Sequence, residues 1–319
     1  MNGEKQGGRR IDTHHHILPP SYAKEAREGL LTVAPTNPAL FDWTPRRAIE
    51  EMDKGGIEIA VTSISTPGVW FGDRAQAQRL ARSCNDYATE MVRDFPGRFA
   101  TFATLPLPAI DDSLKEIEYA YDVLGVDGFC LMTNYGDKWP GDPAFAPVLD
   151  ELDRRKAVLF FHPTTPNCCV GLIPDIAPAA MEFLFDSTRA IASLIYSGTT
   201  TRCRNIRYIF SHGGGTVPYI IDRFAGVPMK KPIVAARVPD GPLHHLKGFF
   251  YDIATICNPI TFGALRQLVG TGQMLYGSDT PFSSTEEMAQ GFAELHLTDG
   301  EREAIERGNA TRLLPALIG

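Results

Sequence analysis

The sequence predicts a (β/α)8 barrel of the TIM type, with a short excursion after the first strand and helices at the C-terminal end. Short β-rich runs alternate with amphipathic helical segments, with no internal repeat or low-complexity stretch. There are eight β-rich runs, which is the number a closed barrel needs. An open doubly wound sheet would show the same alternation. The placement of histidines and carboxylates at the ends of the runs favours the barrel, whose reactive groups lie at the C-terminal ends of its strands.

The elements follow one another in regular order. The predicted strands are residues 11–16, 57–65, 99–107, 128–133, 157–163, 206–213, 249–254 and 274–279. The predicted helices between them are residues 46–54, 73–95, 112–124, 145–156, 178–197 and 260–269. Prolines and an asparagine interrupt the longer connection after the first strand, which predicts an excursion over the barrel mouth.

One catalytic domain accounts for the length of the chain. It has 319 residues, 44% of them hydrophobic, and a single α/β barrel typically fills about 250 residues. We expect a flexible tail over residues 1–10, which read MNGEKQGGRR, and one barrel domain over residues 11–319. Neither an apolar signal core nor a membrane-spanning segment is evident, so we expect a cytoplasmic protein with no membrane partner.

Charge and cysteine content narrow the function classes further. The net charge of -7 leaves no basic field for phosphate backbones, so we expect no nucleic-acid partner. None of the six cysteines forms a C-x-x-C pair, which argues against a zinc ribbon or a thioredoxin-like motif. The adjacent Cys168 and Cys169 could sense redox state, but two small buried hydrophobic residues near a strand end are the interpretation that we favour.

The first strand ends in a run of polar residues, DTHHH, at positions 12–16. Because side chains alternate along a strand, Asp12, His14 and His16 are expected to point to one side and His15 away from the barrel interior. Two imidazoles separated by one residue can hold one metal ion.

Three further strands end in groups of the same kind. His162 ends the fifth predicted strand, His212 lies in the sixth within SHGGG, and Asp279 lies in the eighth within YGSDTPF. A buried histidine taken alone is more often a hydrogen-bonded core residue than a ligand. Together with the H-x-H of the first strand, these residues predict a divalent metal site, since imidazole and carboxylate suit such ions and leave a position for substrate.

This order of H-x-H, His, His and Asp resembles the amidohydrolase superfamily. The phrases IDTHHHILPP, HP after the fifth strand, SHGGG with a later arginine, YGSDTPF and the segment 51–53 are similar to its decarboxylase branch. That branch includes aminocarboxymuconate-semialdehyde, γ-resorcylate, 5-carboxyvanillate and 6-methylsalicylate decarboxylases. The resemblance extends from about Ile11 to the C-terminal helices.

The resemblance implies roles for individual residues. It makes His212 a catalytic residue that does not hold the metal firmly, and it places Arg223 in the site of a neighbouring subunit, which implies a homodimer or a dimer-based oligomer. The substrate-binding arginine that the family has after the first strand has no counterpart near Asn37. The implied ligands of one divalent metal per chain are His14, His16, His162 and Asp279. Because imidazoles predominate, we expect Zn²⁺, with Mn²⁺ as the alternative.

Several other enzyme classes lack their signatures here. Binuclear relatives need a bridging group, commonly a carboxylated lysine at the end of strand four, and residues 128–133 contain no lysine. HGGG occurs in some esterases, but the G-x-S-x-G of that fold is missing, as are a P-loop and a G-x-G-x-x-G motif. The glycine triplet either lets backbone pass close beneath substrate or forms a tight turn into the next helix.

The resemblance implies non-oxidative decarboxylation of a small carboxylic acid, with an aromatic acid bearing an ortho hydroxyl favoured. Asp279 would deliver the proton to ring carbon while His212 polarises the substrate, or the two roles are exchanged. Trp70, Phe71 and Phe282 could form the pocket walls, with ordinary core packing as the alternative, favoured for Phe71.

Two other functions compete with this prediction. Hydrolysis of a lactone or amide by a metal-bound hydroxide, with His212 or Asp279 as base, would use nearly the same residues. A barrel that only binds or scaffolds a partner would be expected to have lost some of the ligands, and none is missing.

Overall fold

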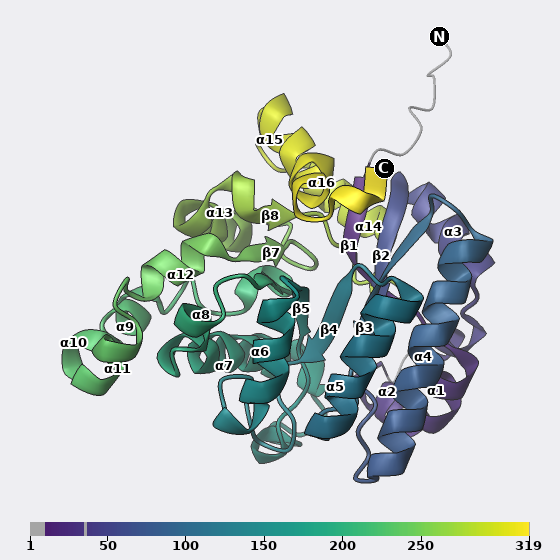
Figure 1. The fold of residues 1–319 in the computed structure, drawn as a ribbon. Coiled ribbons are helices and arrows are strands. Elements are labelled where there is room, and N and C mark those ends of the chain that lie inside the picture. Colours follow the sequence, from purple (N-terminus) through teal and green to yellow (C-terminus); the bar gives the residue numbers. More distant parts are fainter. Residues whose placement is uncertain (1–9, 35–36, 319) are drawn as a thin grey trace.

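The computed structural model describes residues 10–34 and 37–318, and its centre is a ring of eight parallel strands in sequence order (Figure 1). All eight predicted strands are present, several of them shorter than predicted. The strands are β1 (Arg10–His16), β2 (Ile57–Ser63), β3 (Phe99–Thr104), β4 (Gly128–Met132), β5 (Val158–His162), β6 (Arg207–Phe210), β7 (Phe250–Asp252) and β8 (Met274–Leu275).

Backbone hydrogen bonds close the ring between the first strand and the segment that follows β8. The amide of Thr13 donates to the Tyr276 carbonyl over 2.9 Å, and the amide of His16 donates to the Thr280 carbonyl over 2.7 Å. In the other direction, the amide of Asp279 donates to the His14 carbonyl over 2.8 Å. The predicted (β/α)8 barrel is thereby confirmed.

Helices surround the strands on the outside of the barrel (Figure 1). The six predicted helices correspond to α3 (Pro45–Lys54), α4 (Arg74–Asp94), α5 (Ile110–Tyr119) with its π-helical continuation η2 (Ala120–Leu124), α6 (Ala146–Arg154), α7 (Glu182–Tyr196) and α13 (Pro259–Val269). The excursion after β1 contains α1 (Pro20–Glu25), α2 (Arg27–Val33) and the 3-10 helix η1 (Pro38–Asp42).

The remaining helices are short. Between β6 and β7 lie α9 (Ile221–Ala225), α10 (Val227–Lys230), α11 (Pro232–Arg237) and α12 (Pro242–Gly248), and α8 (Thr199–Arg202) precedes β6. The C-terminal helices are α14 (Thr285–Ala293), α15 (Asp299–Glu303), η8 (Ala304–Gly308), α16 (Asn309–Leu313) and η9 (Pro315–Ile318). Short 3-10 turns complete the set: η3 (Pro143–Phe145), η4 (Asn167–Cys169), η5 (Pro178–Ala180), η6 (His212–Gly214) and η7 (Thr271–Gln273).

Residues 1–9 of the predicted tail lie outside the described residues. Arg10, the last residue of the predicted tail, already pairs with β2. The division into tail and single domain therefore stays a prediction. Within residues 10–34 and 37–318, no helix is long and apolar enough to cross a membrane.

Two apolar layers form the core. Side chains that alternate along the strands fill either the barrel interior or the space between strands and helices. The interior cluster includes Val61, Phe102, Phe160 and Ile209, and Leu313 of α16 packs against it at the end of the barrel where β1 begins (Figure 1). The polar groups therefore gather at the opposite end, above an apolar floor whose Phe160 ring lies 5.0 Å from that of His14.

Candidate metal centre

A β-bulge in β1 determines which way the polar side chains near its C-terminal end point. The pairing register with β2 shifts between Asp12 and His15, so an extra residue on β1 interrupts the alternation. Simple alternation had predicted that Asp12 shares the face of His14 and His16. This prediction was wrong, because the bulge turns Asp12 to the other face. Its carboxylate instead accepts a hydrogen bond from the His15 ring over 3.0 Å, and both are fully buried.

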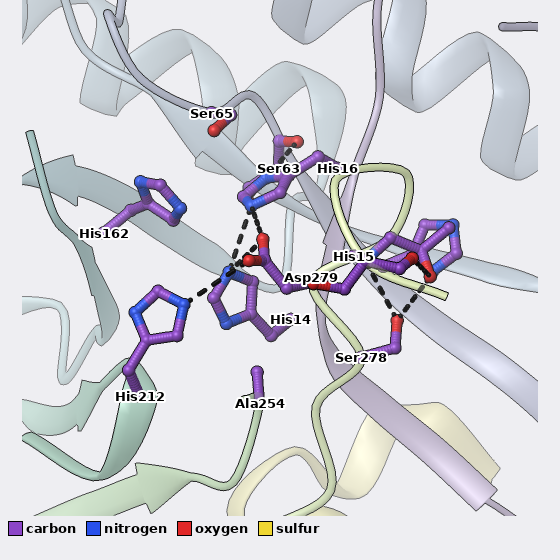
Figure 2. A network of polar contacts seen from close by, with 12 residues as sticks. His14, His15, His16, Ser63, Ser65, His162, His212, Ala254, Ser278 and Asp279 are labelled. Atoms are coloured by element: carbon purple, nitrogen blue, oxygen red, sulfur yellow. Dashed lines mark hydrogen bonds and ion pairs between the residues drawn. The ribbon is translucent and has the colours of Figure 1, made fainter. Parts of the chain in front are cut away.

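Four predicted residues meet at the mouth of the barrel (Figure 2). Single donor atoms of His14, His16, His162 and Asp279 all lie within 4.8 Å of one another. The Nε2 atoms of His14 and His16 are 3.0 Å apart, and each lies 3.2 Å from Oδ1 of Asp279. Three imidazoles and one carboxylate from β1, β5 and the end of β8 thus converge on one small volume.

The orientation of the three imidazoles suits a cation. In each ring, Nδ1 faces an oxygen acceptor, which favours a proton on Nδ1 and makes Nε2 the atom that can bind a cation. The acceptors are the Asp252 carboxylate for His14 at 2.9 Å, the Ser63 carbonyl for His16 at 3.3 Å and the Pro163 carbonyl for His162 at 2.9 Å. A donor set of three Nε2 lone pairs and a carboxylate fits a divalent ion.

Burial and charge set the protonation of this group. Burial lowers the pKa of His16 and, with the neighbouring imidazoles, holds that of His162 well below its usual value. Burial also acts to lower the pKa of His14, but the carboxylates of Asp252 and Asp279 outweigh it and raise that pKa to about 10. Burial would raise the pKa of Asp279, yet the His14 charge and hydrogen bonds from imidazoles hold it well below its usual range. His16, His162 and Asp279 are thus ready for a cation, and His14 must release a proton to bind one.

Asp252 is a residue of the candidate site that the sequence analysis missed. It is fully buried on β7, and its Oδ2 faces Nδ1 of His14. Its Oδ1 accepts 3.0 Å hydrogen bonds from the backbone amides of His212 and Ala254. One signal was present, because Asp252 lies near the end of a predicted strand, as the other site residues do.

His212 differs from the three other histidines. Its Nε2 lies 3.5 Å from Oδ2 of Asp279, whereas His14 and His16 face Oδ1 of that carboxylate (Figure 2). Its Nδ1 is buried and bonds no described residue, so no acceptor fixes its tautomer. A ring that faces a carboxylate and is free to exchange its proton suits acid–base chemistry more than ligation.

A cavity of about 610 Å³ opens above this group. Its polar lining includes His212, Asp279 and Thr255, and all three hold positive φ angles of 51°, 62° and 60°. Such backbone strain in residues other than glycine is concentrated at functional sites. The full lining is Val33, Ala34, Asn37, Ser65, His162, Ala177, Ala179, Ala180, Phe183, Leu184, His212, Thr255, Asp279, Phe282 and Ser283.

Of the three aromatic residues predicted as pocket walls, the structure places one in the cavity lining. Phe282 lines the cavity, and its ring lies 5.5 Å from that of His16. Trp70 is half-buried and is not among the lining residues in the described part of the chain, and Phe71 is exposed. The structure therefore brings Phe282, but not Trp70, together with the metal-centre residues.

Within the described residues, the cavity lining contains no lysine or arginine. Asn37 lies in the lining, and its side-chain amide donates to the Pro281 carbonyl over 3.3 Å. Arg223 is exposed on α9, in the group of short helices that projects from the barrel (Figure 1). No described carboxylate pairs with it, and the residues before it form turns, so that the helix begins only at Ile221.

The glycine triplet after His212 forms a tight turn packed against a helix. Gly215 has a φ of +69°, and a Cβ placed on it would lie 2.1 Å from the Leu184 carbonyl of α7. Only glycine fits such an approach. This arrangement corresponds to the predicted tight turn, which directs the chain away from His212.

Comparison with known proteins places this geometry in a family. The model of the amidohydrolase family matches residues 11–316. The chain belongs to the amidohydrolase family. Among its relatives, this amidohydrolase is 34% identical to 6-methylsalicylic acid decarboxylase acuB of Aspergillus aculeatus, over 97% of this chain and 96% of that protein. It is 32% identical to decarboxylase macB of Penicillium terrestre, over 96% of this chain and 95% of that protein.

A solved structure agrees with the fold. The amidohydrolase superposes on 5-carboxyvanillate decarboxylase of Novosphingobium aromaticivorans with a TM-score of 0.86 at 20% identity, covering 98% of this chain and 97% of that one. That protein was solved in complex with manganese and a nitrobenzoic acid. The resemblance to the decarboxylase branch, inferred from the strand-end residues, is confirmed.

Asp252→Asn tests the buried carboxylate behind His14. The substitution keeps the shape, but an amide that still accepts from the two backbone N–H groups turns its NH2 toward Nδ1 of His14. This would move the His14 proton to Nε2 and block the lone pair. We expect metal affinity, measured by competition with a chelator, to fall by about 10–100-fold, and His14→Ala to lose the ion outright.

Asp186→Asn is the matched control. Asp186 is also fully buried, but its partners include Thr133, Asn134 and Trp139, outside the donor set. Equal metal affinity in Asp252→Asn and the unaltered protein would show that Asp252 does not orient His14.

Proposed function

We propose that this amidohydrolase removes carbon dioxide from a small aromatic carboxylic acid that carries a hydroxyl ortho to the carboxylate, with one divalent ion held by His14, His16, His162 and Asp279. The observation that carries the proposal is the convergence of three imidazole nitrogens and a carboxylate beneath a cavity with an apolar wall. The decarboxylases among its relatives supply the reaction class.

The reaction breaks one carbon–carbon bond and forms one carbon–hydrogen bond. The electron pair of the bond to the carboxylate stays on ring carbon when carbon dioxide leaves, and a proton must then reach that carbon. When bound, a divalent ion supplies Lewis-acid stabilisation of negative charge on the substrate oxygens.

Asp279 and His212 are the residues placed to handle the proton. Oδ1 of Asp279 faces His14 and His16, whereas Oδ2 faces Nε2 of His212. When protonated, Asp279 is the acid that can give its proton to the ring carbon. His212 would polarise the substrate and return a proton to Oδ2 of Asp279. If His212 is instead the proton donor and Asp279 polarises the substrate, the proton passes through the same contact between Nε2 and Oδ2.

Further features complete the proposal. Zn²⁺ is the proposed ion because three of the four donors are imidazoles, and Mn²⁺, found in the solved relative, is the alternative. Phe282 would pack against the substrate ring, whereas Trp70 is not in the cavity lining among the described residues and is not proposed as a wall residue. The six cysteines are all free thiols, which favours a reducing compartment such as the cytoplasm. The proposed domain organisation is a single barrel domain over residues 11–319.

A substrate panel tests the reaction class. Metal-loaded protein is incubated with hydroxybenzoates and muconate-like acids, and carbon dioxide release is followed by mass spectrometry, with lactones and amides as the competing set. We expect carbon dioxide from ortho-hydroxybenzoates. Hydrolysis of a lactone or amide, with no carbon dioxide from any acid, would establish the alternative hydrolase function.

His212→Ala separates catalyst from ligand. The variant should keep most of its metal, because His212 lies outside the donor set, while turnover falls by about a hundredfold or more, the scale of a lost general acid or base. His245→Ala, which removes a buried histidine away from the cavity, is the control. Near-normal turnover of His212→Ala would make that residue structural.

We further propose that Arg223 enters the site of a second copy in a two-fold dimer. The cavity lacks a cationic side chain of its own among the described residues, while Arg223 is exposed and has no described carboxylate partner. In a two-fold dimer the same patch faces its own copy, so two arginines could each grip the substrate carboxylate in the partner's cavity.

Complementation tests this arrangement. Inactive Arg223→Ala and Asp279→Ala proteins are mixed under conditions that exchange subunits. A mixed dimer has one site that lacks both groups and one intact site, so equal mixing should restore about one quarter of normal activity. Lys230→Ala, on the neighbouring α10, should remain active by itself. Subunit exchange proven by mass without recovered activity, or a strictly monomeric protein, would contradict the shared site.

A further inference from the structure

Two adjacent cysteines lie in the connection between β5 and α7, within the 3-10 turn η4. Cys168 is exposed and Cys169 is buried. The expectation of two buried hydrophobic residues was therefore wrong for Cys168, because η4 has already left the strand and runs along the surface. Neither residue takes part in the metal centre.

The two thiols are in direct contact. Their Sγ atoms lie 2.8 Å apart, and the guanidinium of Arg189 on α7 approaches Sγ of Cys169 to 3.8 Å. Arg189 also lies 3.5 Å from Asp186 and 3.7 Å from Glu182, which hold it in place. The Arg189 cation acts to lower the pKa of Cys169, which helps this thiol to lose its proton in the second step of a disulfide exchange.

The two sulfurs differ in what they can do. The hydrogen bond with Cys168 raises the pKa of Cys169 to about 11, so Cys169 keeps its proton at neutral pH. Cys168 is the one that solvent reaches. An oxidant therefore meets Cys168 first, with Cys169 directly behind it as the resolving thiol.

We propose that Cys168 and Cys169 form a modification site at which a disulfide oxidant such as oxidised glutathione closes a disulfide between adjacent residues. The Cys168 thiolate attacks one sulfur of the oxidant, forms a mixed disulfide and releases one reduced glutathione. Cys169 then loses its proton and attacks Sγ of Cys168, which releases the second. The protein gives up two electrons and two protons, and one oxidised glutathione becomes two reduced molecules.

The modification is readily reversed. Adjacent Cα atoms are only about 3.8 Å apart, below the roughly 4.4–6.8 Å that ordinary disulfides span. The ring is therefore strained, and strained disulfides are the more easily reduced. Such a bond responds to the thiol balance around it rather than locking permanently.

The position of the pair links it to the cavity. The same β5–α7 connection supplies Ala177, Ala179 and Ala180 to the cavity wall, and Cys169 packs in a small hollow with Ala177. Closing the ring changes the backbone of η4 and, through this packing, the apolar side of the cavity. Oxidation should therefore lower activity reversibly.

Intact-mass measurement on the full, metal-loaded protein tests the proposal. With oxidised glutathione, the protein should lose two hydrogen atoms, and peptide mapping without reductant should place the change at residues 168–169. Cys169→Ser should stop at one glutathione adduct, because the resolving thiol is gone. Cys168→Ser should react little, since Cys169 is buried. Cys257→Ser, which removes another partly exposed cysteine, should behave as the unaltered protein.

An unchanged mass, or an adduct that persists on the unaltered protein, would overturn the proposal. These readouts do not depend on the reaction that the barrel catalyses, so they hold even if the proposed decarboxylation fails. Turnover measured before oxidation, after it and after dithiothreitol tests the link to the cavity. Unchanged turnover of fully oxidised protein would overturn that link.

Discussion

The Asp252 carboxylate occupies the position on which the rest of the site depends. One of its oxygens orients the His14 ring, and the other accepts a hydrogen bond from the backbone amide of His212, two residues after the end of β6. A single buried anion thus fixes the tautomer of a proposed ligand and the location of the proposed acid–base residue. Because unpaired charges are costly to bury, removing any one partner disturbs the others, and the geometry is held as a unit.

The sequence predicted the fold and most of the site because both rest on local signals. Alternating strand and helix patterns identified all eight strands, and the residues at their ends identified His14, His16, His162, His212 and Asp279 as neighbours. The bulge in β1 had no such signal, because it depends on the register between two strands, and so Asp12 was placed on the wrong face. Asp252 was missed for a related reason, since its role exists only through contacts with distant residues.

The cavity combines backbone strain at its polar base with an apolar wall. His212, Thr255 and Asp279 all adopt left-handed backbone conformations at the ends of neighbouring strands, each of which costs of order 1–3 kcal/mol. The surrounding hydrogen bonds, such as that from the Asp279 amide to the His14 carbonyl, hold this strain in place. The polar base of the cavity thus lies beneath an apolar wall that includes Phe282.

The metal-centre residues can come together during synthesis only after the C-terminal segment that closes the barrel has been made. One edge of β1 pairs with β2 early, but its other edge waits for Tyr276, 263 residues after Thr13. At ordinary translation rates that edge stays unpaired for on the order of tens of seconds, and open strand edges are what aggregation exploits. Asp279 emerges from the ribosome with the same closing segment. A nascent chain that stalls before this point lacks both the last backbone pairing and the carboxylate donor, so completion of the sheet and the capacity to acquire metal arrive in one step.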